Sequence, residues 1–316
     1  MINKNSKIFV AGHNGLVGTA IVRKLLENKY KNVIFEEKKK LNLLNQKKVE
    51  NFFKKNKPEY VIIAAARVGG IKANSEKVAE FIYENIQIQN NLIHYSYKFK
   101  VKSLIFLGSS CIYPKYSKQP IKESYLLTDK LEDTNEAYAI AKIAGVKMCE
   151  YYNQQYKTNF KSLMPTNTFG PNDNYNLNTS HFLPALIRKI YEAKANNKKN
   201  IYLWGNGKTK RELIYVDDLA EASIYFLFKK TRQNLINIGT QKDYKIEHYA
   251  KKIMKILKVN LKIKYIKKNL KGTPRKLLDC SIAKKLGWEA KIKIDQGLEL
   301  SIKDFIEYYK KYSKIN

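Results

Sequence analysis

The chain has 316 residues, 44% of them hydrophobic, and a formal net charge of +32. This length allows one large α/β domain or two smaller ones. The N-terminal segment has no apolar stretch of signal-peptide length, and no run approaches the ~18 apolar residues of a membrane span. We therefore expect a cytoplasmic protein without a membrane partner.

The basic residues are almost all lysine. Nucleic-acid binding is the function that so positive a charge would indicate. Only six of the 60 basic residues are arginine, and the 54 lysines are dispersed over nearly every expected helix and loop. This dispersal favours solvated lysine-rich faces, so we expect no nucleic-acid partner. Where an arginine does occur, its planar, two-pronged guanidinium offers geometry that lysine lacks.

The three cysteines, Cys111, Cys149 and Cys280, are scattered along the chain. They lack the paired spacing of a disulfide framework or a zinc site. We therefore expect neither disulfides nor a bound metal.

Short apolar runs alternate with helical patterns in the first half of the chain. The runs cover residues 7–12, 33–35, 60–66, 103–109 and 160–165, and the helical patterns cover 16–28, 46–55, 75–97 and 136–155. This alternation predicts an α/β fold with a doubly wound parallel sheet of the Rossmann type. Each run is nearly continuous, as expected for strands covered by helices on both faces.

The regular alternation ends after residue 170. A polar loop at 171–180 precedes a helix from about 182, a strand near 200–204, a helix at 217–229, a strand at 235–240, two helices and a lysine-rich strand near 260–267. We predict a dinucleotide-binding domain that spans 1–170 and regains 212–240. A smaller mixed α/β domain, made of 171–211 and 241–316, would cap it and bind the substrate.

Three glycines separate the first expected strand from its helix. Gly12, Gly15 and Gly18 are spaced as in loops that let the backbone approach a pyrophosphate, and the following helix presents free N–H groups. This context predicts a dinucleotide site. The second strand ends near both an acid, Glu36, and a base, Lys38. These residues leave open whether the cofactor is NAD, held through its 2′-hydroxyl, or NADP, held through its 2′-phosphate.

Tyr138 and Lys142 are four residues apart on an expected helix, so they share one helix face. A lysine ammonium beside a phenol stabilises the phenolate and lowers its pKa from a value near ~10. The loop before this helix carries Ser109, Ser110 and Cys111 at the carboxyl end of a strand, where doubly wound sheets bind ligands. The two segments together predict a catalytic site.

Longer stretches carry a resemblance to a known family. They are AGHNGLVGTAI, AAARVGGIKAN, FLGSSCIYPK, KQPIKES, TNEAYAIAKIAG, MPTNTFGPNDN, SHFLPALIRK, RELIYVDDLA and GTPRKLLD, and they run from residue 11 to 279, with KKLGWE following at 284–289. The chain resembles the extended short-chain dehydrogenase/reductases, and within them the GDP-L-fucose synthase type. That type epimerises a GDP-4-keto-6-deoxymannose at C3 and C5 and reduces it at C4.

The resemblance implies a reductase triad of Ser109, Tyr138 and Lys142. The serine and tyrosine would hydrogen-bond the C4 oxygen, the tyrosine would donate the proton, and the lysine would also hold the nicotinamide ribose. For the epimerisation, the family's base and acid correspond here to Cys111 and His181. Thiols titrate at ~8.5 and imidazoles at ~6.5, which suits proton transfer at neutral pH. Taken alone, His181 could equally lie at the start of a helix without a role.

The resemblance further implies residues that bind the two nucleotides. Those for the cofactor are Gly12, Asn14, Gly15, Leu16, Val17, Gly18, Lys38, Asn42, Leu43, Ala65, Ala66, Lys142, Pro165, Asn167 and His181. Those for the substrate are Ser109, Ser110, Cys111, Tyr138, Asn167, Lys189, Trp204, Arg211 and Asp279. Asn14 and Lys189 stand where the family usually has arginine. We expect NADP(H), with Lys38 contacting the 2′-phosphate, and NAD(H) stays open.

Other functions remain open on the sequence. The protein could be a C4 reductase without epimerase activity, acting on a related GDP-4-keto sugar such as a heptose in surface-polysaccharide biosynthesis. Cys111 and His181 can persist after the epimerase activity is lost. The protein could also be an idle dinucleotide-binding module associated with RNA, although the intact triad argues against this. We expect a homodimer that binds a GDP-4-keto sugar.

Overall fold

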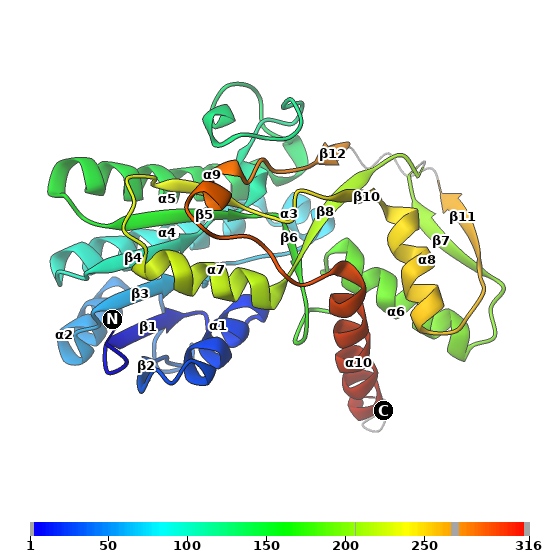
Figure 1. The fold of residues 1–316 in the computed structure, drawn as a ribbon, viewed down its shortest axis with the longest axis horizontal. Coiled ribbons are helices and arrows are strands. Elements are labelled where there is room, and N and C mark those ends of the chain that lie inside the picture. The colour runs from blue at the N-terminus through cyan, green and yellow to red at the C-terminus, as the bar shows by residue number, and fades with distance from the viewer. Residues whose placement is uncertain (1–2, 206, 267–271, 313–316) are drawn as a thin grey trace.

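The structure is a computed structural model that describes residues 3–205, 207–266 and 272–312. Its main sheet has six strands, all parallel, in the order β2-β1-β3-β4-β5-β9 (Figure 1). Their bounds are Lys7–Ala11 (β1), Asn32–Ile34 (β2), Tyr60–Ile63 (β3), Ser103–Leu107 (β4), Phe160–Pro165 (β5) and Leu235–Ile238 (β9). The strand order reverses between β1 and β3, so the carboxyl ends of these two strands flank the crevice where such sheets bind ligands.

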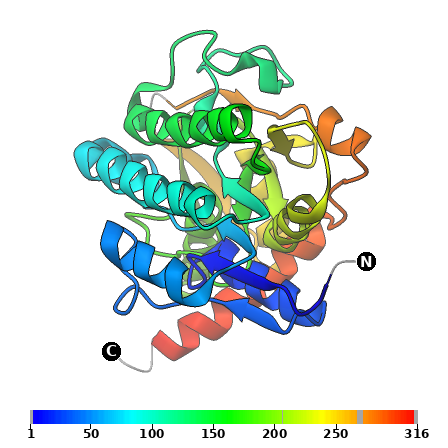
Figure 2. The same ribbon diagram turned by 90° about the vertical axis from the view of Figure 1, so that its left-hand side faces the viewer.

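Helices cover both faces of this sheet. Successive side chains of a strand point to opposite faces, so a continuous apolar strand presents apolar side chains to both. Phe9 and Ala11 of β1 lie in one buried core, and Ile8 and Val10 lie in the other. The first core includes residues of α2 (Gln46–Asn56), α4 (Val78–Lys98) and α5 (Glu136–Tyr156), and the second includes residues of α1 (Leu16–Glu27), α7 (Val216–Phe228) and α9 (Ser281–Lys285). Figure 2 shows the cyan α4 and the green α5 side by side on one side of the sheet.

A second part of the fold lies beyond the carboxyl ends of the main strands (Figure 1). Its larger sheet joins β8 (Lys210–Tyr215) to β10 (Asp243–Lys245), β12 (Arg275–Lys276) and β6 (Asn167–Phe169), and a smaller sheet pairs β7 (Asn200–Trp204) with β11 (Lys262–Ile266). The helices α6 (Phe182–Ala195), α8 (Ile246–Ile256) and α10 (Ile294–Tyr312) enclose a third buried core. Short helical segments complete the described fold: α3 (Ile71–Glu76), η1 (Ser110–Ile112), η2 (Glu123–Tyr125) and η3 (Asp133–Asn135).

The doubly wound parallel sheet predicted from the sequence is confirmed. Three details differ from the expectation. One helix, α8, lies between β9 and β11, where two were expected. The helix expected over 75–97 is divided into α3 and α4 at Lys77, whose backbone (φ −125°, ψ 40°) is not helical. The sequence also did not predict β6, β8, β10 and β12, which are short or rich in charged residues.

The two-domain division remains a prediction. Residues 216–238 contribute α7 and β9 to the main sheet and its second core, as expected for a segment that returns to the first domain. The strand β8 at 210–215 instead belongs to the second sheet. Part of the expected strand near 260–267 falls on residue 267, which lies outside the described residues.

Candidate active site

The glycine loop after β1 packs closely against the neighbouring backbone. Gly12 has φ +89°, and a Cβ atom there would lie 2.5 Å from the backbone nitrogen of Ala65. A Cβ atom at Gly18 would lie 2.0 Å from the carbonyl oxygen of Gly12, so helix and loop touch. α1 begins at Leu16 after the N-cap Gly15, without a side-chain cap. The first N–H groups of α1 are thus available to an anion such as a pyrophosphate.

The other predicted cofactor residues follow the carboxyl ends of successive parallel strands. Lys38 is exposed beyond β2, where the ring of Phe35 stacks on His13 with centroids 4.7 Å apart. The Asn42 side chain accepts a hydrogen bond from the Leu44 N–H. The remaining ones lie in the glycine loop, in the first turn of α1, after β2 and β3, at the end of β5, in β6 and before α6: Asn14, Val17, Leu43, Ala65, Ala66, Pro165, Asn167 and His181. They therefore line one edge of the fold.

Lys142 links α5 to the end of β4. Its ammonium nitrogen donates a hydrogen bond to the carbonyl oxygen of Leu107 over 2.8 Å and lies 5.7 Å from the centroid of the Tyr138 ring. Ser109 follows β4 directly, and its hydroxyl oxygen accepts the Cys111 N–H over 3.2 Å. The predicted triad thus comes from one helix and the loop beside it.

Burial controls the protonation of Tyr138 and Lys142. It raises the pKa of the Tyr138 phenol, and the charge of Cys111 adds to this effect. It also lowers the pKa of Lys142 to about 7. The expectation that Lys142 lowers the pKa of the phenol is wrong, because desolvation of the buried phenolate is the largest effect and the shift is upward. Tyr138 accordingly keeps its proton at neutral pH, as a proton donor must.

The sulfur of Cys111 receives two polar contacts. The Lys276 ammonium lies 3.2 Å from it and the side-chain amide nitrogen of Asn135 lies 3.7 Å from it. Cys111 is half-buried, whereas Cys149 and Cys280 are buried and have raised pKa values. Cys111 is therefore the cysteine that a substrate can reach.

The charges of Lys276 and Cys111 affect the pKa values of His181 and Arg211, respectively. His181 is exposed before α6, yet desolvation lowers the pKa of its imidazole and the charge of Lys276 lowers it further. Burial lowers the pKa of Arg211, while attraction to Cys111 opposes this effect. Arg211 and Lys276 are also direct partners in the pairing of β8 with β12. His181 and Arg211 thus each interact electrostatically with a member of the Lys276–Cys111 pair.

Four other predicted substrate residues lie elsewhere or have structural contacts. The Lys189 ammonium lies 4.9 Å from the ring centroid of Trp204, so α6 and β7 form a separate cluster. The Asp279 carboxylate accepts the Ser281 N–H at the start of α9. Ser110 is buried in η1.

Sequence reasoning assigned no role to Lys276, Asn135 or Glu212. All three occur in stretches that carry the family resemblance, but no local pattern distinguishes them. The fully buried Glu212 accepts the N–H groups of Thr240, Gln241 and Leu278 and so ties β8 to two distant loops. Burial raises its pKa to about 7.

Within residues 3–205, 207–266 and 272–312, no helix is long and apolar enough to cross a membrane. The same residues contain no group of three or more histidine, cysteine, aspartate or glutamate side chains that could hold a metal ion.

Residues 8–239 match the family model described as "NAD dependent epimerase/dehydratase family". The chain belongs to this family. It is 47% identical to a putative GDP-L-fucose synthase 2 of Arabidopsis thaliana, over 97% of this chain and 94% of that protein. It is 43% identical to a GDP-L-fucose synthase of Escherichia coli K12, over 95% and 97% of the two chains. These epimerase/dehydratase relatives confirm the resemblance inferred from the sequence.

A solved structure of the same architecture also matches. It is a GDP-D-glycero-L-gluco-heptose synthase from Campylobacter jejuni in the presence of NADPH, with a TM-score of 0.89 and 35% identity, covering 97% of this chain and 100% of that one.

Proposed function

We propose that the protein is an NADPH-dependent oxidoreductase that reduces the C4 ketone of a GDP-4-keto-6-deoxy sugar after epimerising C3 and C5, as in GDP-L-fucose synthesis. The observation that carries this proposal is the 3.2 Å contact between the Cys111 sulfur and the Lys276 ammonium. The charge of Lys276 also acts on His181, and that of Cys111 acts on Tyr138. Identities of 43–47% to GDP-L-fucose synthases along nearly the whole chain support it.

For the reduction, Tyr138 is the proton donor. Its buried phenol holds its proton at neutral pH and gives it to the C4 oxygen, while Ser109 hydrogen-bonds the same oxygen. Bound NADPH supplies the hydride that C4 receives. The Gly12–Gly18 loop fits this cofactor, because α1 begins after the N-cap Gly15 without a side-chain cap, and its first N–H groups can bind the pyrophosphate.

For the epimerisation, Cys111 and His181 act on opposite sides of the sugar. The C4 ketone acidifies the neighbouring C–H bonds, so Cys111 takes a proton from carbon and the electron pair moves to the C4 oxygen. His181 then returns a proton to the other face of that carbon, and its configuration inverts. The C4 oxygen, with its hydrogen-bond donors, is common to epimerisation and reduction.

The GDP group needs cationic and stacking partners. Arg211 would bind the diphosphate, since a guanidinium can donate two parallel hydrogen bonds to it. Lys189 and Trp204 form the separate cluster between α6 and β7, and they would contact the rest of the nucleotide. The Trp204 side chain is 46% exposed. Asn167, Ser110 and Asp279 remain proposed contacts. A homodimer remains our proposal for the assembly, supported by exposed Tyr83, Ile140, Tyr151 and Tyr156 on α4 and α5.

Adding purified protein to GDP-4-keto-6-deoxymannose and NADPH tests this function. We expect the NADPH absorbance to fall only when the 4-keto sugar is present, and not with GDP-mannose, which has no ketone to reduce. NADPH that stays unoxidised with the keto sugar would refute the reductase.

A heptose reductase without epimerase activity is the second candidate. Its support is the fold shared with the Campylobacter heptose synthase, at 35% identity. The higher identity to the GDP-L-fucose synthases favours the first candidate. Turnover with a GDP-4-keto-heptose that is much faster than with the deoxyhexose would reverse this order.

Lys38→Glu is expected to remove or reverse a preference for NADPH over NADH. The exposed Lys38 would lie against the 2′-phosphate, and a carboxylate there repels it. We expect kcat/KM for NADPH to fall about tenfold and that for NADH to change little. Lys40→Glu, an exposed change of the same charge in the same turn, is the control. A wild type that prefers NADH would refute this assignment and make Glu36 the better candidate for binding the ribose.

NADPH binding is expected to take up a proton above neutral pH. With a pKa lowered to about 7, Lys142 is mostly neutral at about pH 8 before the cofactor binds, and the anionic cofactor favours its ammonium form. Below about pH 6 Lys142 is already charged, so the uptake disappears. Calorimetry in buffers of different ionisation enthalpy measures it. Lys142→Met should abolish the uptake, whereas Lys161→Met should retain it, because Lys161 is buried near the opposite end of β5. Equal uptake in both variants would exclude Lys142 as the source.

A further inference from the structure

Lys276 makes a contact to which the mechanism above gives no chemical role. Its ammonium nitrogen lies 3.2 Å from the sulfur of Cys111, and the Asn135 amide nitrogen lies 3.7 Å from that sulfur. Both groups are hydrogen-bond donors. Two donors directed at one sulfur match a thiolate, which accepts hydrogen bonds, better than a thiol, which has a proton to donate.

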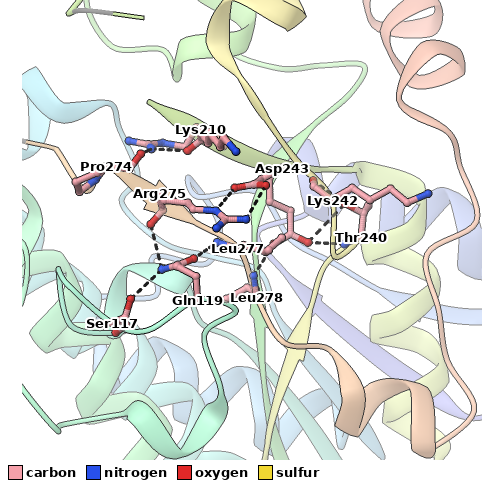
Figure 3. A network of polar contacts seen from close by, with 12 residues as sticks. Ser117, Gln119, Lys210, Thr240, Lys242, Asp243, Pro274, Arg275, Leu277 and Leu278 are labelled. Carbon is pink, nitrogen blue, oxygen red and sulfur yellow. Dashed lines mark hydrogen bonds and ion pairs between the residues drawn. The ribbon is translucent and has the colours of Figure 1, made fainter. Parts of the chain in front are cut away.

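The backbone around Lys276 is held firmly (Figure 3). The Gln119 side chain donates to the Arg275 carbonyl and accepts the Leu277 N–H, so it bridges the residues on either side of Lys276. Arg275 forms an ion pair with Asp243 on β10. The next N–H along the chain, that of Leu278, donates to the buried Glu212. These contacts fix the point from which the Lys276 side chain reaches Cys111.

Asn135 has an unused acceptor. Its side-chain oxygen is buried and has no hydrogen-bond partner among the described residues, although its nitrogen contacts Cys111. Asn135 directly precedes α5, three residues before Tyr138. An acceptor there can take a hydrogen bond from a sugar hydroxyl and bring the adjacent C–H bond to the sulfur.

We propose that Lys276 is a positioning residue for epimerisation, which holds Cys111 as a thiolate base while Asn135 orients the sulfur. This proposal rests on the proposed function. When the base acts, a C–H bond of the sugar breaks, an S–H bond forms, and the electron pair passes to the C4 oxygen. Lys276 keeps its own proton throughout, because its role is electrostatic.

The diphosphate is the competing partner for Lys276, because Arg211 is its neighbour across the strand pair. The two roles give different results on mutation. A partner of the thiolate changes the reactivity of Cys111 when no substrate is present. A ligand of the diphosphate changes only the affinity for GDP.

Alkylation by iodoacetamide, followed against pH, tests the pairing without substrate. We expect Lys276→Met to slow alkylation of Cys111 at neutral pH about tenfold or more, and to move the midpoint of the rate profile upward by about one pH unit or more. Lys276→Arg should retain most of the rate. Lys245→Met is the matched control, since it removes one exposed lysine from the same sheet. Cys111→Ser gives the background from the buried thiols.

Deuterium exchange links this reactivity to the sugar. In Lys276→Met we expect the rate of deuterium exchange at C3 and C5 to fall at least tenfold more than the rate of reduction of a sugar supplied already epimerised. Retained reduction of that sugar also shows that the variant is folded. Unchanged alkylation with weaker GDP binding would overturn the proposal and make Lys276 a diphosphate ligand. If alkylation depends on Lys276 but the wild type exchanges no deuterium, the pairing stands and the epimerase part of the proposed function fails.

Discussion

Tyr138→Phe is expected to lower kcat for C4 reduction by about 10³-fold while the Kd for NADPH stays nearly unchanged. The ring would still pack edge-on against Phe81, whose centroid lies 6.3 Å away, so the fold around α5 is preserved. What disappears is the proton that the C4 oxygen needs. Because burial raises the pKa of this phenol, no loss of activity from its ionisation is expected across the neutral range.

Tyr151→Phe is the matched control, since Tyr151 lies on the same helix and is 55% exposed. It should keep wild-type rates. Steady-state rates and cofactor titrations measure both variants. A Tyr138→Phe enzyme with wild-type turnover would exclude Tyr138 as the proton donor.

Cys111→Ser is expected to slow deuterium exchange at C3 and C5 by about 10³-fold in deuterium oxide without NADPH. The exchange needs only the ketone and the acid/base pair, so it proceeds while the hydride step is blocked. A serine hydroxyl is a far weaker base than a thiolate. The same variant should still reduce a sugar supplied with C3 and C5 already inverted, because Ser109, Tyr138 and Lys142 are intact.

Nuclear magnetic resonance of the recovered sugar measures this exchange. A wild type that incorporates no deuterium but rapidly reduces the inverted sugar would be a reductase alone, and Cys111 would have no part in proton transfer. Exchange that persists in Cys111→Ser would instead assign the base to another residue.

The parallel sheet was predictable because its strands are continuous apolar runs, each followed by a helical pattern. The glycine loop and the Tyr138–Lys142 spacing are likewise local patterns. β12 was not predictable in this way. It has only two residues, and both are basic. It is a strand because it pairs with β8, in which Lys210, the partner of Arg275, lies 65 positions earlier in the sequence.

The candidate site was predictable only where its residues form local motifs. The contact between Lys276 and Cys111 joins residues 165 positions apart, and no local pattern records such a pair. Glu212 has charged neighbours in the sequence, a pattern typical of an exposed acid. It is nevertheless fully buried, because backbone N–H groups of two distant loops donate hydrogen bonds to it. The pKa shift of Tyr138 was predicted in the wrong direction, because the sequence shows the neighbouring lysine but not the burial of both groups.

The stereochemistry of the product tests the central claim most directly. Purified protein, GDP-4-keto-6-deoxymannose and NADPH are incubated together, and the product is analysed by nuclear magnetic resonance. We predict GDP-L-fucose, with C3 and C5 inverted and C4 reduced. A reduced sugar in which C3 and C5 keep the configuration of the substrate would contradict the account.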